Sequence, residues 1–422
     1  MSSTRLVVQT REFDPVDDLL AYAHPHSPLA WLRRGDGIVA VGDSAPVTIR
    51  VPADRGPLRS AVIAESWRAL TDAAEINDPV QLPGTGLVGF GALTFDEGSA
   101  ADSVLVVPSM ILGRHRGRGW ITRIAVSGTE LPGDQPGATL SPVAYGPHWA
   151  GTVGPGRQSP AGYQASIRDA LERIGAGEAS KIVLARDLEG TIPAGSDLRR
   201  LVRELSTGYP DTWTFAVDGL IGASPETLVT VQDRTVTARV LAGTIGRGAD
   251  ADEDAAASAR LAASVKDLDE HQYAVRSLLE SLRPHVRAMA SSEQPFLLKL
   301  PNLFHLATDV EGELSAGESA LDLVGALHPT AAVAGTPTPA AVAAIRELEP
   351  FDRGRYAGPV GWIDANGNGE WAIALRCAQF SAGDDTIAVT AHAGAGIVAA
   401  SDPETELLET RVKFRPLVDA LA

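Results

Sequence analysis

The stretch Phe215–Ala238, FAVDGLIGASPETLVTVQDRTVTA, decides the fold class because it contains two short polar turns between runs of strand-forming residues. The first turn is Asp218-Gly219, and the second is Gln232–Arg234. Short turns between such runs are typical of antiparallel β-hairpins. The centre of the chain is therefore predicted to be antiparallel β-sheet.

Helical patterns lie on both sides of this predicted sheet. We expect an amphipathic helix from about Ala161 to Ala176, a long Ala-rich helix or helix pair from about Asp252 to Met289, and a last helix from Pro403. Strand-like runs separate them, and one of these, Glu370–Arg376, alternates and places Arg376 on the face of Ala372 and Ala374. Blocks of sheet and helix predict an α/β fold of the α+β type.

A Pro- and Gly-rich segment from about Ser127 to Pro160 connects two parts of the chain. The part before it shows no recognisable chemistry, whereas regular elements and the candidate site residues follow it. The length of 422 residues and the apolar share of 44% fit one large domain or two modest ones.

Composition excludes several classes of function. The formal net charge of −17 argues against nucleic acid or an anionic membrane as a partner. The sequence shows neither a signal peptide nor a membrane-spanning run, so we expect a cytoplasmic protein. Cys377 is the only cysteine, which excludes an intrachain disulfide and a thiolate metal cluster.

Two ionisable residues stand where a predicted strand meets a turn. Lys181 opens the apolar run Lys181–Ala185, and Glu226 follows Ser224-Pro225 at the start of another strand. A lysine can act as a general base only when burial or nearby positive charge favours its neutral form. Together they suggest a base and an acid at one site. Taken alone, each is more commonly a solvated residue at a strand end.

Two pairs of carboxylates are three residues apart on predicted helices, Asp267 with Glu270 and Glu406 with Glu409. Residues three apart share one helix face, so two such helices could converge on a cation. Mg²⁺ prefers oxygen ligands and often takes only one or two protein carboxylates. The pairs therefore predict two ligands and two supporting groups for Mg²⁺, and the alternative is two solvated acidic faces. The small-residue loop Gly394–Gly396, which precedes the second pair, could admit an anionic ligand to its backbone amides.

Three further residues could bind an anionic substrate or pack in the core. Arg376 could bind a carboxylate through the parallel N–H groups of its planar guanidinium. Lys413 could bind one as a point charge. Each is more commonly a surface residue or part of an ion pair, and Lys413 follows Glu409 by one helical turn. His305 lies in an apolar run, where a hydrogen-bonded core histidine is the usual explanation.

A series of short motifs follows in a fixed order through the second part of the chain. The motifs are Lys181–Arg186, Gly222–Glu226, Leu241–Thr244, Lys266–His271, Leu327–Thr330, Gly335–Pro337, Glu349–Gly354, Tyr356–Gly358 and Ala393–Gly396. Together they resemble the chorismate-utilising enzymes, which include isochorismate, salicylate, anthranilate and aminodeoxychorismate synthases. The resemblance covers roughly residue 160 to the C-terminus, and the first 150 residues match only loosely.

The resemblance implies a fold and a domain organisation. In this family, two large and mostly antiparallel β-sheets pack face to face with helices outside, and the site lies between them. Residues 1–422 would form a single large domain, in which residues 1–150 complete the sheets and residues 160–422 form the chorismate-binding catalytic region.

The resemblance also implies roles for the candidate residues. Lys181 would activate water and Glu226 would protonate the departing hydroxyl of chorismate. Mg²⁺ would be the cofactor, bound by Glu270 and Glu409 with support from Asp267 and Glu406. The substrate contacts would be Thr244, His305, Ala332, Tyr356, Arg376, Gly394 and Lys413, with Tyr356 and Arg376 at the enolpyruvyl carboxylate.

Differences within the family favour an isochorismate synthase. The isochorismate and salicylate synthases resemble this chain in having a lysine at position 181, which the ammonia-using branches lack, so no glutamine amidotransferase subunit is expected. Ala332 follows the isochorismate pattern where salicylate synthases tend to have threonine, whereas Tyr356 fits either. Salicylate synthase is the second hypothesis and a non-catalytic chorismate-binding subunit the third. The product would feed menaquinone or siderophore biosynthesis, and the family suggests a monomer or homodimer.

Overall fold

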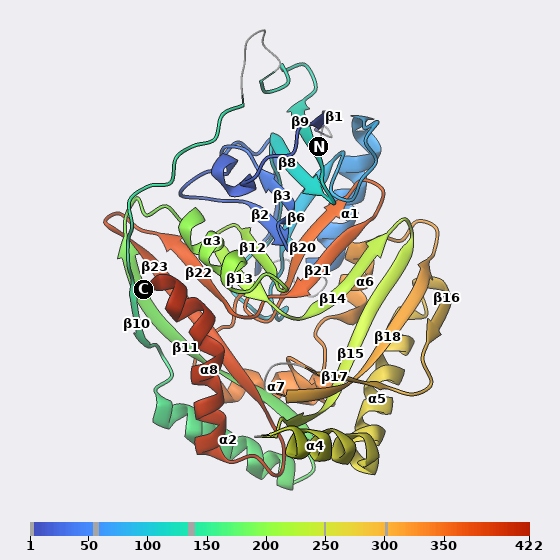
Figure 1. Ribbon diagram of the computed structural model, residues 1–422, viewed down its shortest axis with the longest axis vertical. Coiled ribbons are helices and arrows are strands. Elements are labelled where there is room, and N and C mark those ends of the chain that lie inside the picture. Colours follow the sequence, from blue (N-terminus) through green and yellow to red (C-terminus); the bar gives the residue numbers. More distant parts are fainter. Residues whose placement is uncertain (1–3, 54–58, 134–139, 249, 300–302) are drawn as a thin grey trace.

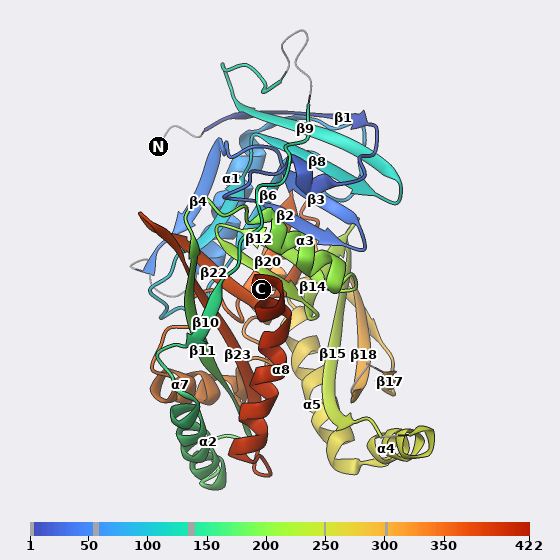
Figure 2. The ribbon, with the colours of Figure 1, turned by 60° about the vertical axis from the view of Figure 1, so that its left-hand side comes forward.

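The computed structural model describes residues 4–53, 59–133, 140–248, 250–299 and 303–422, which form two large β-sheets (Figures 1 and 2). The strands of the first sheet, in spatial order, are β10 (Thr152–Pro155), β11 (Lys181–Pro193), β23 (Thr386–Ile397), β22 (Cys377–Ala382), β13 (Leu220–Ser224), β12 (Trp213–Val217), β2 (Ala30–Arg33), β3 (Asp36–Ala40), β8 (Met110–His115), β9 (Arg118–Val126), β1 (Leu6–Phe13) and β5 (Glu75–Asn77), with β19 (Gly335–Thr336) beside β11. Those of the second are β16 (Val286–Ser291), β18 (Leu303–Leu314), β15 (Thr235–Gly246), β14 (Thr227–Gln232), β21 (Gly369–Ile373), β20 (Pro359–Asp364), β6 (Val88–Ala92), β7 (Ser103–Val107) and β4 (Val47–Val51), with β17 (Phe296–Lys299) beside β18. Neighbouring strands run antiparallel in most pairs, and β1 and β5 run parallel.

Helices cover the outside of these sheets. They are α1 (Arg59–Ala73), α2 (Pro160–Gly175), α3 (Arg199–Gly208), α4 (Ala251–Ala263), α5 (Val265–Leu282), α6 (Ala320–Leu327), α7 (Thr338–Leu348) and α8 (Pro403–Leu421), with a short 3₁₀ turn at Leu19–Tyr22. The lower part of Figures 1 and 2 divides into two arms, one built of β11, β23, α2 and α8, the other of β15, β18, α4 and α5. Over the described ranges, no helix combines the length and the apolar character needed to cross a membrane.

The two predicted hairpins are confirmed. β12 and β13 are joined at Asp218 and Gly219, whose φ angles are 48° and 78°, and β14 and β15 are joined at Asp233 and Arg234, with φ of 49° and 66°. Positive φ at both central residues is the geometry that matches the twist of the flanking strands. These local turns therefore fix the register around Glu226, which lies between the two hairpins.

Two element boundaries differ from the predictions. The long Ala-rich segment is a helix pair that ends at Leu282, because Val286–Met289 belongs to strand β16. The alternating run that was expected to reach Arg376 ends as β21 at Ile373. Arg376 has φ of 51°, in the left-handed region, so the chain leaves the strand before this residue.

The N-terminal part of the chain contributes strands to both sheets. β1, β2, β3, β8 and β9 extend the first sheet, and β4, β6 and β7 extend the second. The largest buried hydrophobic cluster combines side chains from both halves of the sequence, including Trp31, Phe90, Phe215, Trp362 and Trp371. The space between the sheets is thus filled by residues as far apart in the chain as Leu6 and Leu407.

A buried ion pair ties the strand of Lys181 to the segment that follows α7. Arg353 and Glu349 are 5% and 6% exposed, and their closest ion-pair distance is 2.6 Å. The Arg353 guanidinium also donates to the carbonyls of Val183 and Val333, and the Glu349 carboxylate accepts from the backbone N–H of Ala185. The pair therefore holds β11 and the residue 333 segment in one arrangement.

Glu349→Ala is expected to lower the free energy of unfolding by about 3–5 kcal/mol, because it leaves the Arg353 charge buried without its partner. The matched control is Glu347→Ala, which removes the exposed partner of Arg173 from the last turn of α7 and should cost less than about 1 kcal/mol. Urea unfolding followed by tryptophan fluorescence measures both. Equal midpoint shifts for the two variants would contradict the structural role of the buried pair.

Candidate active site

Lys181 lies at the first position of β11, against a glycine-rich part of β23. A side-chain carbon added at Gly396 would come within 2.7 Å of the Lys181 Cε, so the absence of a side chain there makes room for the lysine. On its other side, β19 pairs with β11, and a Cβ at Gly335 would lie 2.1 Å from the Lys181 carbonyl oxygen. Two glycines on neighbouring strands thus admit Lys181 and its backbone.

Glu226 lies between β13 and β14, where the chain passes from the first sheet to the second. The Ser224 hydroxyl donates to the Ile373 carbonyl at 2.5 Å and accepts from the Glu226 N–H at 3.2 Å, while the Ile373 N–H donates to the Glu226 carbonyl. The backbone of Glu226 is therefore fixed to β21.

The surroundings of Glu226 favour its protonated form. Burial raises the pKa of the Glu226 carboxyl, while the positive charges of Lys181, Arg376 and Lys413 oppose the rise. The net shift is upward, because the loss of hydration of the charged form is the largest effect. The predicted base and acid, and the two predicted cationic substrate contacts, are thus electrostatic neighbours.

Arg376 lies near this carboxyl, and Tyr356, from another connection, lies near Arg376. The Arg376 carbonyl accepts from the Ala223 N–H at 3.2 Å, which anchors the left-handed turn to β13. Burial lowers the pKa of Arg376, and the nearby Tyr356, Glu226 and Glu409 counteract that change. Tyr356 is 7% exposed, and burial raises the pKa of its hydroxyl. Arg376 is therefore an electrostatic neighbour of both Glu226 and Tyr356.

Helix α8 brings Lys413 and the second carboxylate pair to the same region. The Lys413 Nζ donates to the Gly394 carbonyl at 2.8 Å and lies 2.5 Å from the Glu409 carboxylate. Burial raises the pKa of Glu406, the neighbouring Glu409 adds to the rise, and Ser401 and Lys413 oppose it. The second predicted pair thus consists of two carboxylates that repel one another on one helix face.

The first predicted pair lies on α5 in the other arm. Asp267 packs near Gly243, where an added Cβ would lie 3.2 Å from the Asp267 Cβ. The Asp267 carboxylate also accepts a hydrogen bond from Ser264, the residue that caps α5, so it has a structural role that the sequence analysis missed. The side chain of Glu270 is outside the part of the chain that the structure describes, although its backbone belongs to α5.

His271 positions this part of α5. It is 1% exposed, and its ring nitrogens bond to the Ala242 carbonyl at 3.1 Å and the Thr308 hydroxyl at 2.7 Å. These contacts join α5 to β15 and β18. His271 lies within one of the quoted motifs, but its sequence neighbourhood gave no sign of this positioning role.

His305 on β18 and Thr244 on β15 are paired in the strand register, next to a bulge at Gly243. The register shifts between Ala242 and Thr244, and Gly243 has φ of 79°, as glycine commonly does in such bulges. Burial lowers the pKa of His305, and the charge of Lys181 lowers it further. The hydrogen bond to the Gly243 backbone opposes this decrease. His305 is therefore neutral near Lys181, while the Thr244 side chain lies outside the described residues.

The remaining predicted contacts, Ala332 and Gly394, lie at the edges of this region. Ala332 is exposed in the turn before β19. A Cβ at Gly394 would lie 2.6 Å from the Leu184 carbonyl oxygen, so the close approach of β23 to β11 requires glycine there. Among the described residues, no group of three or more His, Cys, Asp or Glu side chains is close enough to hold a metal ion.

Comparison with known proteins identifies relatives. Residues 146–422 match the family described as chorismate binding enzyme. The isochorismate synthase DhbC of Bacillus subtilis is 41% identical over 274 residues, covering 62% of this chain and 68% of that protein. The MenF protein of Mycobacterium tuberculosis is 39% identical over 352 residues, covering 80% of this chain and 87% of that protein.

A solved structure supports the same relationship. The crystal structure of a DhbC protein from Bacillus anthracis superposes with a TM-score of 0.71 and 31% identity, covering 96% of this chain and 98% of that one. The predicted fold of two mostly antiparallel sheets with helices outside is confirmed by this likeness and by the strand order.

Proposed function

The chain belongs to the chorismate-binding enzymes, and from that premise we propose that it is an isochorismate synthase, which converts chorismate to isochorismate. The observation that carries the proposal is the cluster around Glu226, whose pKa is raised by burial and whose neighbours include Lys181, Arg376 and Lys413. Replacement of one hydroxyl by another requires an acid for the departing hydroxyl and a base for the incoming water. A buried carboxyl beside an amine can supply both. The relatives described above support the same reaction.

In the proposed reaction, water attacks C2 of chorismate and the C4 hydroxyl departs. The neutral amine of Lys181 takes one proton from the attacking water as its oxygen bonds to C2. The ring double bonds shift, the C4–O bond breaks, and Glu226 gives its proton to the hydroxyl, which leaves as water. One water enters and one water leaves, so substrate and product are isomers. Lys181 gains one proton and Glu226 loses one.

Arg376 and Tyr356 are proposed to hold the enolpyruvyl carboxylate, with Lys413, His305, Thr244, Ala332 and Gly394 lining the rest of the substrate site. A guanidinium provides two parallel N–H groups for a carboxylate, and a partly buried one binds it more strongly than in water. Arg376 is partly buried and its turn is anchored to β13, so it is pre-oriented for this contact.

The carboxylates on α8 fit the proposed Mg²⁺. Burial and the neighbouring Glu409 raise the pKa of Glu406, and a cation beside these carboxylates would offset that rise. All four carboxylates supply the oxygen ligands that Mg²⁺ prefers. Glu270 and Glu409 would hold the ion, with Asp267 and Glu406 in support, and the bound ion would supply positive charge to orient the ring carboxylate of the substrate.

We place the product in menaquinone or siderophore biosynthesis. The enzyme would act as a cytoplasmic monomer or homodimer, as one domain, and without a glutamine amidotransferase subunit, since water rather than ammonia is the nucleophile.

Purified protein is expected to convert chorismate to isochorismate in the presence of Mg²⁺ and without ammonia. EDTA should abolish the conversion, and excess Mg²⁺ should restore it, because the carboxylates alone cannot orient an anionic substrate. Chromatography that resolves isochorismate, salicylate and pyruvate measures the outcome. Equal amounts of salicylate and pyruvate would indicate a salicylate synthase, and unchanged chorismate with Mg²⁺ would indicate a non-catalytic subunit.

A further inference from the structure

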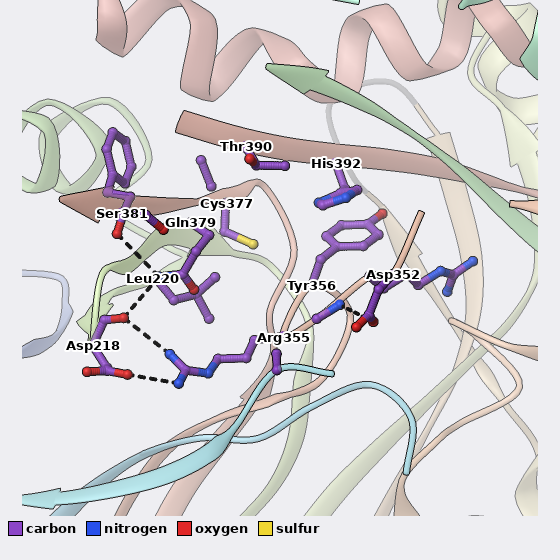
Figure 3. Close-up of a pocket in the computed structure, with 15 residues that line it drawn as sticks. Asp218, Leu220, Asp352, Arg355, Tyr356, Cys377, Gln379, Ser381, Thr390 and His392 are labelled. Carbon is purple, nitrogen blue, oxygen red and sulfur yellow. Dashed lines mark hydrogen bonds and ion pairs between the residues drawn. The ribbon is translucent and has the colours of Figure 1, made fainter. Parts of the chain in front are cut away.

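A cavity of about 420 Å³ lies between strands β13, β22 and β23 and the segment 352–356 that precedes β20 (Figure 3). We call it the rear pocket. The residues proposed above as base, acid and metal ligands do not line it, and Tyr356 is shared between it and the proposed substrate site. The rear pocket is therefore a separate cavity with one wall in common with that site.

The position of this wall follows from the alternation along β23. Thr390, His392, Gly394 and Gly396 lie on one face of the strand, which spans about 20 Å over these residues. Lys181 lies over Gly396 at one end, and Thr390 lines the rear pocket at the other. The ring of Tyr356 stacks on His392, with centroids 5.1 Å apart and planes at 24°. The stacked pair thus separates the rear pocket from the end of the strand where Lys181 lies.

The charges that line the rear pocket are paired within the protein. Asp218 receives hydrogen bonds from Arg355 at 2.8 Å and Arg50 at 3.1 Å, as Figure 3 shows for Arg355. Arg353 is bound to Glu349. The pocket therefore offers a charged ligand no unpaired group of opposite sign among these residues, and burying an unpaired charge is costly.

The other titratable groups of the pocket are also satisfied or neutral. Asp352 accepts hydrogen bonds from the Ser99 hydroxyl at 2.9 Å and the Ala100 N–H at 2.7 Å. Burial lowers the pKa of His392 to about 4, so its ring is neutral at physiological pH. These observations favour a ligand without net charge.

The walls of the rear pocket combine flat, apolar and polar surfaces. Tyr356 supplies an aromatic ring and Leu220 and Cys377 supply apolar contacts, while Thr390 and Gln379 supply hydrogen-bonding groups. A ring compound stacks on aromatic walls, and its hydroxyl or amide groups find partners among such polar side chains. The volume lies in the range of small-molecule pockets, about 300–1,000 Å³.

We propose that the rear pocket binds an uncharged planar molecule of one or two rings, and that the bound molecule changes chorismate binding through Tyr356. The second part rests on the proposed function, since it requires Tyr356 to contact the substrate. The floor of the pocket is pre-formed, because Arg355 is held by the Asp102 carbonyl as well as by Asp218. A ligand would therefore act mainly on the Tyr356 ring rather than on that floor.

The test uses 4-fluorophenol as the probe, observed by fluorine NMR with the intact protein. The wild type is expected to bind it saturably, and Thr390→Phe, which fills the pocket, should weaken binding by at least about tenfold. Thr386→Phe is the matched control, because Thr386 lies on the same strand, is exposed and does not line the pocket. Undiminished binding by Thr390→Phe, or no saturable binding by the wild type, would overturn the proposal.

Two measurements separate this result from binding in the substrate site and from misfolding of the variant. A wild-type crystal soaked with 4-bromophenol should show the anomalous signal of bromine in the rear pocket, and bromine found only elsewhere would refute it. Probe binding of equal strength by the wild type and Thr390→Phe, lost when Mg²⁺ and chorismate are added, would place the probe in the substrate site. The probe should raise the KM for chorismate in the wild type but not in Thr390→Phe. If neither protein turns over chorismate, the proposed function fails while the binding result stands.

Discussion

Lys181→Ala is expected to lower kcat for isochorismate formation by about 10²–10⁴-fold, the range that one general base typically contributes. The substitution leaves open space over Gly396 and removes no buried hydrophobic contact of the core, so the fold should persist. Steady-state turnover of chorismate with Mg²⁺ measures the change, and circular dichroism and the thermal midpoint report on folding. Retained turnover in a folded variant would remove Lys181 from the mechanism.

Two further variants separate the loss of a base from the loss of a charge. Lys181→Arg keeps a positive charge but has no neutral form near physiological pH, so it should be as inactive as the alanine variant. Lys299→Ala is the matched control, because Lys299 is a surface partner of Asp254 with 58% of its side chain exposed, and its turnover should stay within about twofold of the wild type. Activity restored by arginine would show that position 181 supplies only charge.

Much of the local fold could be predicted from the sequence because short turns carry their own signals. Asp218-Gly219 and Asp233-Arg234 adopt positive φ at adjacent residues, and the flanking strands follow. The cap of α5 could also be predicted, since Ser264 precedes Asp267 by three residues. The sequence analysis assigns the Asp267 carboxylate only to metal binding. One residue can fit both a helix-capping pattern and a metal-binding pattern. The sequence alone does not show which of the two roles it has.

Long-range pairing could not be predicted in the same way. The alternation around Arg376 continues through the sequence, but Ala223, more than 150 positions earlier, binds the Arg376 carbonyl and the chain turns there. Likewise, β2 lies beside β12 because the first sheet is assembled from distant segments, which no local periodicity specifies. The meeting of Lys181 and Glu226 depends on this assembly, so the sequence suggested the pair and the fold supplied their proximity.

The neighbours of the site were the least predictable part. His392 lies in no candidate set, yet it stacks on Tyr356 and lines the rear pocket. Its role follows from the order of β22 and β23 and from the segment 352–356, which pack together only in three dimensions. Motif spacing suggests candidate site residues, but the residues that hold their side chains in place depend on the packing.

Glu226→Gln is expected to lower kcat by about 10²–10⁴-fold and to remove the fall in activity at high pH. The raised pKa of the Glu226 carboxyl keeps it protonated, and the wild type loses this acid as pH rises through that pKa. Glutamine retains the shape but gives no proton, so only the limb due to Lys181 should remain. A pH–kcat profile of both proteins measures this, and Glu404→Gln, exposed at the start of α8, is the control that should keep the wild-type profile.

The same substitution should leave the folded state unchanged or more stable above the pKa of Glu226. A pKa that is raised in the folded protein means that the carboxyl's contribution to stability is complete below its ordinary range, about 4.3, and is lost as pH rises through the folded value. Glutamine carries no charge to bury, so its thermal midpoint should equal the wild type at pH about 4 and exceed it at higher pH. A midpoint that falls below the wild type at high pH would show that Glu226 is charged and paired in the resting protein, and the acid role would then be wrong. A gain in stability together with the loss of turnover would instead identify a group that is kept at an energetic cost for its chemistry.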